Sequence, residues 1–100
     1  MKVAFIGGGN MAGALIGGMV QAAFNASDID VVEIDAARRA ELAERDSVRT
    51  HELPGDWLRA SEVIVLAVKP QQMREAVAAI QPHLKQQCVL SIAAGVRAET

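Results

Sequence analysis

The feature that most constrains this chain is a run of three glycines between a strand-like and a helix-like segment. Residues 3–6 are apolar and rich in β-branched and aromatic side chains, which is typical of a buried strand. Gly7, Gly8 and Gly9 follow directly, and a helical pattern begins at Asn10. A strand that passes through a glycine turn into a helix brings free N–H groups and the positive end of the helix dipole together. This arrangement favours binding of a pyrophosphate.

The spacing of Gly7, Gly9 and Ala12 matches the G-x-G-x-x-G/A fingerprint of dinucleotide-binding domains. In that fingerprint the first glycine makes a tight turn, the second admits the pyrophosphate, and the third small residue lets the helix pack closely. The alternative interpretation is a glycine-rich turn without a ligand. The motif alone is weak, but the strand before it and the helix after it favour a dinucleotide.

Strand-like and helix-like segments alternate along the whole chain. We predict strands at 2–7, 30–34, 47–51, 62–68 and 87–92, and helices at 10–23, 36–45, 55–60 and 70–84. Such alternation predicts an α/β fold of Rossmann type. We expect a doubly wound, mainly parallel sheet in the order 3-2-1-4-5, with helices on both faces. The chain of 100 residues is long enough for one small domain.

The apolar pattern also predicts the core. Cys88 begins a strand expected to be buried and is interpreted as a core thiol, and Trp57 is expected to pack on a helix face. Gly13, Gly17 and Gly18 lower the propensity of the first helix, so we expect them to allow close packing on the sheet or on a cofactor. The following residues of the first and last helices are expected to face the core: Met11, Ala12, Leu15, Ile16, Met19, Met73, Val77 and Ile80.

Composition and charge exclude several classes of function. The net charge is −2 and there is no basic cluster, which argues against a nucleic acid or an anionic membrane surface as partner. A single cysteine allows no internal disulfide and favours a cytoplasmic location, and the apolar runs are too short to span a bilayer. His51 and His83 have no further ligand at suitable spacing, so no metal site is expected. No nucleophile with a base, and no carboxylate pair, can be identified, so no catalytic residue is assigned.

Charged residues follow the second and fourth strands, where open α/β sheets bind their ligands. Glu33 or Asp35 is placed to accept hydrogen bonds from a ribose 2′-hydroxyl, whereas Arg38 and Arg39 could instead bind a 2′-phosphate. The alternative is that all four are solvated surface charges. Lys69 could contact a phosphate or a substrate, or be a solvated lysine that matters only for its backbone.

The small residues at 91–95 would let a nicotinamide ring approach the backbone, although tight loop packing would need the same residues. Three segments together resemble a known family. FIGGGNMAGALIGG at 5–18, LAVKPQ at 66–71 and SIAAGV at 91–96 are similar to the N-terminal half of pyrroline-5-carboxylate reductases. The resemblance implies the NAD(P)H-dependent reduction of 1-pyrroline-5-carboxylate to L-proline, the last step of proline biosynthesis.

The resemblance also implies which residues hold the cofactor. The first segment would line the pyrophosphate and adenosine side, the second would lie near the nicotinamide ribose, and the third near the nicotinamide. The expected residues are, in this order, Ile6, Gly7, Gly8, Gly9, Asn10 and Met11; Ala67, Val68, Lys69 and Pro70; and Ile92, Ala93 and Ala94.

The sequence departs from the family at two positions. Relatives often carry a Ser or an Asn-Arg pair at the end of the second strand, suited to NADPH, where this chain has Glu33 and Ile34. NADPH is usual for the family, but Glu33 and Asp35 leave NADH open. An Asn found before the fourth strand in some relatives is replaced by Pro54.

The resemblance further implies that residues 1–100 are a truncated N-terminal NAD(P)-binding domain, which by itself would be inactive. The family's C-terminal helical domain would bind the cyclic imine and form a homo-oligomer. Two alternatives stay open: another two-domain NAD(P)-dependent oxidoreductase, such as a 3-hydroxyacid or deazaflavin-dependent enzyme, or a non-catalytic NAD(H)-sensing domain. The VKPQ segment argues against the other oxidoreductases.

Overall fold

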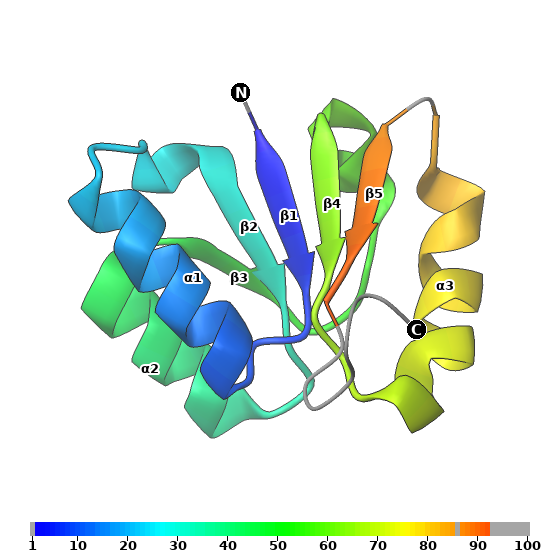
Figure 1. Ribbon diagram of the computed structural model, residues 1–100, viewed down its shortest axis with the longest axis horizontal. Coiled ribbons are helices and arrows are strands. Elements are labelled where there is room, and N and C mark those ends of the chain that lie inside the picture. The colour runs from blue at the N-terminus through cyan, green and yellow to red at the C-terminus, as the bar shows by residue number, and fades with distance from the viewer. Residues whose placement is uncertain (1, 86, 93–100) are drawn as a thin grey trace.

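Five short segments form the strands of one parallel sheet, with helices on both faces (Figure 1). The computed structural model describes residues 2–85 and 87–92. The strands are β1 Val3–Ile6, β2 Ile29–Val32, β3 Arg49–His51, β4 Val63–Leu66 and β5 Cys88–Ser91. The α-helices are α1 Asn10–Gln21, α2 Ala36–Asp46 and α3 Met73–Ile80. Short 3-10 helices are η1 Ala26–Asp28, η2 Asp56–Ala60, η3 Pro70–Gln72 and η4 Gln81–His83.

The strand order is β3-β2-β1-β4-β5, and every neighbouring pair is parallel. This confirms the predicted fold class and strand order. In the centre of the sheet Phe5 of β1 is aligned with Val31 of β2 and Val65 of β4. The observed strands are one or more residues shorter than the predicted segments: β3 begins two residues later, β2 ends two residues earlier, and β1, β4 and β5 are shorter at both ends.

Successive side chains of the central strands point to opposite faces and fill two cores. On the face covered by α1 and α2, Phe5 packs with Ile16 and Leu42. On the face covered by η2 and α3, Ile6 packs with Leu58 and Ile80. Both faces of β1 are therefore buried, which explains its uninterrupted apolar sequence.

Helix α1 presents a narrower apolar face to the core than the sequence predicts. Ala12 and Ile16 are buried, as predicted, and Met19 is partly buried. Met11 and Leu15 are 44% and 43% exposed, so their predicted burial is wrong. The row of Ala12, Ile16 and Val20 packs on the core, whereas in the neighbouring row only Met19 does.

Gly13 and Gly17 of α1 face arginines of the neighbouring helix α2. A Cβ on Gly13 would come 2.6 Å from Nη2 of Arg38, and one on Gly17 would lie 3.8 Å from Nη2 of Arg45. A Cβ on Gly18 would meet open space. The expected close packing on the sheet or a cofactor is thus replaced, for Gly13, by close approach of an arginine.

The predicted helix at 70–84 is divided into η3, α3 and η4. Pro82 lies in η4 and has no N–H group, so the α-helical hydrogen-bond pattern ends there. Ile80 is buried and Met73 is partly buried as predicted, but Val77 is exposed, and this part of the prediction is wrong.

Strand β5 lies at the edge of the sheet, and all four of its residues are exposed. The prediction of a buried strand is therefore wrong, and Cys88 is an exposed thiol and not a core residue. At the other edge the ring of Trp57 stacks on His51, with centroids 4.0 Å apart, and it also packs against the core cluster that contains Ile80 of α3. Among residues 2–85 and 87–92, no helix is long and apolar enough to cross a membrane.

Candidate dinucleotide-binding groove

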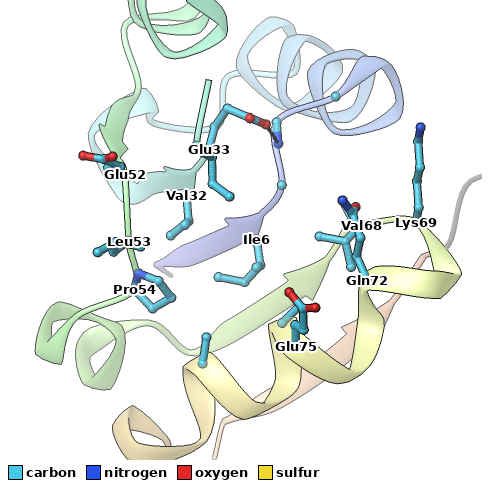
Figure 2. Close-up of a pocket in the computed structure, with 17 residues that line it drawn as sticks. Ile6, Val32, Glu33, Glu52, Leu53, Pro54, Val68, Lys69, Gln72 and Glu75 are labelled. Atoms are coloured by element: carbon cyan, nitrogen blue, oxygen red, sulfur yellow. Dashed lines mark hydrogen bonds between the residues drawn. The ribbon is translucent and has the colours of Figure 1, made fainter. Parts of the chain in front are cut away.

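A groove of about 380 Å³ lies at the carboxyl ends of the strands (Figure 2). Ile6 and Val32 contribute from β1 and β2. Figure 2 shows Glu52, Leu53 and Pro54 on one side and Val68, Gln72 and Glu75 on the other. The groove is therefore located where the strand order changes direction, between β1 and β4, which is the ligand site of doubly wound sheets.

The glycine turn begins at Gly7, whose backbone only glycine adopts easily. Its φ is +101°, and a Cβ there would lie 2.6 Å from the carbonyl oxygen of Ala67. Its N–H donates to the carbonyl of Val32 at 2.7 Å. The turn therefore passes close to the ends of both β2 and β4 on its way to α1.

Gly8 and Gly9 differ in what surrounds them. A Cβ on Gly8 would come 2.8 Å from Cδ1 of Leu42, whereas a Cβ on Gly9 would have nothing within 4 Å. Gly9 is the N-cap residue of α1, and its carbonyl accepts the N–H of Gly13 at 2.8 Å. The start of α1 thus has open space beside it, as an anion at a helix N-terminus requires.

The structure separates the two carboxylates that follow β2. Glu33 lines the groove, where its Oε1 accepts from the N–H of Gly8 at 2.8 Å and its Oε2 from that of Asp35 at 3.0 Å. Asp35 is the N-cap of α2, and its Oδ1 accepts from Ala37 N at 2.9 Å and Arg38 N at 3.4 Å. Glu33 is therefore the carboxylate that faces a ligand in the groove.

The two arginines at the start of α2 bind backbone carbonyls. Arg38 donates to Gly8 O and, at 3.0 Å, to Gly9 O, and it forms an ion pair with Glu41. Arg39 donates to the carbonyls of Glu33 and Ile34, both at 2.8 Å. Neither of these two described side chains lines the groove.

The wall beyond β4 combines predicted and unpredicted residues. Lys69 was expected from its place after a strand, and Ala67 and Val68 from the family resemblance; all three line the groove. Helical residues that sequence reasoning missed complete this wall. They recur at spacings of three and four, which marks one helix face, and they are Gln72, Glu75, Ala76 and Ala79.

The groove brings together Ile6, Gly7, Gly8, Gly9, Glu33, Ala67, Val68 and Lys69. Four other described residues of the predicted site do not line it: Met11 on α1, Asp35, the exposed Pro70 of η3, and Ile92. The N–H of Ile92 donates to Leu66 O at 2.8 Å. Asn10 is the first residue of α1. Ala93 and Ala94 lie outside the described residues.

The charge of the groove is mainly negative. Three glutamates, Glu33, Glu52 and Glu75, and one lysine, Lys69, are among its lining residues. No cluster of three or more His, Cys, Asp or Glu suited to a metal ion occurs in the part of the chain that the structure describes. The groove thus combines apolar walls and carboxylates beside the glycine turn.

Comparisons with known proteins agree with this geometry. The chain is 38% identical to the pyrroline-5-carboxylate reductase of Pseudomonas aeruginosa, over 95% of this chain and 35% of the relative. It is 41% identical to the pyrroline-5-carboxylate reductase of Pasteurella multocida, over 95% of this chain and 36% of the relative. A solved pyrroline-5-carboxylate reductase from Coxiella burnetii superposes with a TM-score of 0.86 at 28% identity, covering 98% of this chain and 37% of that one.

These relatives confirm the resemblance inferred from the sequence, although the chain spans only about a third of their length. The model of a family described as "NADP oxidoreductase coenzyme F420-dependent" matches residues 2–95. The family's cofactor class, a nicotinamide dinucleotide, agrees with the glycine fingerprint and the open space at Gly9. The chain therefore belongs to this family of NADP oxidoreductases.

Proposed function

We propose that residues 1–100 are the N-terminal NAD(P)-binding domain of a pyrroline-5-carboxylate reductase. The enzyme would reduce 1-pyrroline-5-carboxylate to L-proline in the cytoplasm. The observation that carries the proposal is the similarity of almost the whole chain to reductases of this name. The remaining length of such enzymes would bind the imine and form a homo-oligomer.

The groove suits a dinucleotide laid across the ends of β2, β1 and β4. The turn at Gly7–Gly9 and the start of α1 would hold the pyrophosphate, together with Asn10 and Met11. Ile34 and Leu53, which are 76% and 68% exposed beside the groove, offer apolar surfaces for the adenine. Ala67, Val68, Lys69 and Pro70 would lie by the nicotinamide ribose, and Ile92, Ala93 and Ala94 by the ring.

When bound, the dinucleotide supplies the hydride that reduces the imine. The described residues orient it. The Gly7 turn leads the chain from β1, past the end of β4, to the start of α1. The apolar side chains of Ile6, Val32 and Val68 line the groove and would exclude water from it. Catalysis by this domain would thus consist of positioning.

We further propose that the site prefers NADH. Glu33 would accept the ribose hydroxyls, and its charge would repel a 2′-phosphate. Glu52 and Glu75 add to this repulsion, and the guanidinium groups of Arg38 and Arg39 bind backbone carbonyls. Asp35 contributes to the site only by capping α2.

Replacing Glu33 by Gln tests the preference. The neutral amide oxygen can still accept the N–H of Gly8, whereas the NH2 group cannot accept that of Asp35. Because the charge is lost, the affinity for NADH should fall about tenfold while that for NADPH is retained or rises. Asp35→Asn is the matched control, because Asn also caps helices, and both affinities should stay unchanged. Equal losses of NADH and NADPH affinity in Glu33→Gln would contradict the preference.

The activity is tested by assaying the intact protein for pyrroline-5-carboxylate reduction with NADH and with NADPH. Turnover with either cofactor supports the proposal. A folded, intact protein that binds NADH but reduces only another substrate would identify a different oxidoreductase. Binding without any turnover would identify an NAD(H)-sensing domain.

A further inference from the structure

Arg38 of α2 donates hydrogen bonds to the glycine turn. Its Nε donates to Gly8 O and its Nη2 donates to Gly9 O at 3.0 Å, while Nη1 pairs with Glu41. The carbonyl of Gly9 also accepts the first helical hydrogen bond of α1, from Gly13 N at 2.8 Å. The guanidinium fork thus holds two successive peptide groups of the turn.

Fixing these carbonyls also fixes the N–H groups of the same peptides. The peptides are trans, and in a planar trans peptide the C=O and N–H bonds point in opposite directions. The N–H groups of Gly9 and Asn10 therefore point away from Arg38. A Cβ on Gly9 would have nothing within 4 Å, so the turn has open space beside it.

Gly13 provides the space that Arg38 needs. A Cβ on Gly13 would lie 2.6 Å from Nη2 of Arg38, so any larger residue displaces the guanidinium. Gly13 has no such contact with the sheet, and glycine within a helix costs stability relative to alanine. The close approach of Arg38 accounts for a glycine at this position.

We propose that Arg38 is a positioning residue that holds the glycine turn in its pyrophosphate-binding conformation, with Gly13 as its required partner. The inference deepens the proposed function and rests on it, because the dinucleotide must bind at this turn. Arg38 acts through the backbone of Gly8 and Gly9 and does not touch the ligand.

Three variants test this role: Arg38→Lys, Gly13→Ala and the control Gly17→Ala. Lys keeps the charge but cannot span two carbonyls with one rigid fork. Ala at 13 displaces the guanidinium, whereas Ala at 17 would make only an ordinary 3.8 Å contact with Arg45. Binding of NADH and of adenosine, which has no phosphate, is measured by calorimetry, and the melting temperature is recorded for each variant.

We expect Arg38→Lys and Gly13→Ala each to weaken NADH binding about tenfold and to leave adenosine binding unchanged. Gly17→Ala should bind NADH as the unmodified protein does. Both alanine variants should melt at the same or a higher temperature, because alanine favours the helix. The double variant Gly13→Ala/Arg38→Lys should bind NADH as tightly as either single variant does, because both substitutions remove the same contact between Arg38 and the turn.

Unchanged NADH affinity in Arg38→Lys, equal losses for NADH and adenosine, or additive losses in the double variant would overturn the role of Arg38. Each of these outcomes leaves the proposed function intact. An unmodified protein that binds neither NADH nor NADPH would overturn both.

Discussion

The two edges of the sheet are built differently. At the β3 edge, Asp30 is buried and its carboxylate accepts from Arg49 at 2.9 and 3.0 Å and from His51 at 2.8 Å. Trp57 stacks on the same His51. At the β5 edge all four residues are exposed, among them the apolar Val89 and Leu90.

This difference shows where the stability of the domain lies. Charged side chains and a short strand protect the β3 edge, and α2 packs beside β3. The apolar residues of β5 bury little surface within the described part of the chain. We therefore expect substitutions near β3 to cost much more stability than matched substitutions near β5.

Leu42→Ala should have the largest effect. Leu42 is fully buried against β1 and β2, so the substitution should reduce the free energy of unfolding by about 3 kcal/mol. Denaturant unfolding monitored by circular dichroism measures this change. A loss below about 1 kcal/mol would mean that α2 is not the main cover of this face.

Asp30→Asn should have the next largest effect on the free energy of unfolding. It removes the charge that Arg49 and His51 share, and we expect a loss of about 2 kcal/mol in unfolding free energy. The control is Asp56→Asn, which breaks an exposed contact with His83 and should not change the melting temperature measurably. Similar effects of the two variants would mean that the buried Asp30 cluster is no more stabilising than an exposed pair.

The Asp30 cluster should also make stability depend on pH. Burial by itself raises the pKa of Asp30, but the hydrogen bonds and charges of Arg49 and His51 outweigh burial and lower it. A carboxyl whose pKa is lower in the folded state stabilises above its unfolded pKa, and this stability is lost as the pH falls below about 4. Unfolding of Asp30→Asn between pH 6 and 3 should therefore have a shallower pH dependence than that of the unmodified protein.

Leu90→Ala should have the smallest effect. Leu90 is 50% exposed on β5, so the same substitution as at Leu42 should cost less than about 1 kcal/mol. Thermal melts of the two variants, measured side by side, make the comparison direct. A cost equal to that of Leu42→Ala would show that β5 is packed as tightly as the opposite side.

Part of the groove could be predicted because parallel strands end at one edge of the sheet. Gly7 was predicted from the glycine fingerprint, Glu33 from its place at the end of the second strand and Val68 from the family resemblance, and all three line the groove. The residues from η3 and α3 were missed, because the face that a helix turns toward a groove depends on its packing. Glu33 and Asp35 were equivalent in the sequence, and only the fold showed that one faces the groove while the other caps α2.

The sequence by itself determined the Rossmann fold, the strand order and the glycine turn, because hydrophobic periodicity and glycine chemistry are local properties. Tertiary structure alone decided which of the predicted core residues remain exposed. Met11, Leu15 and Cys88 have the composition of core residues but lie where no described element covers them. It also decided the role of Arg38, because burial and long-range hydrogen bonds depend on neighbours that are distant in the sequence.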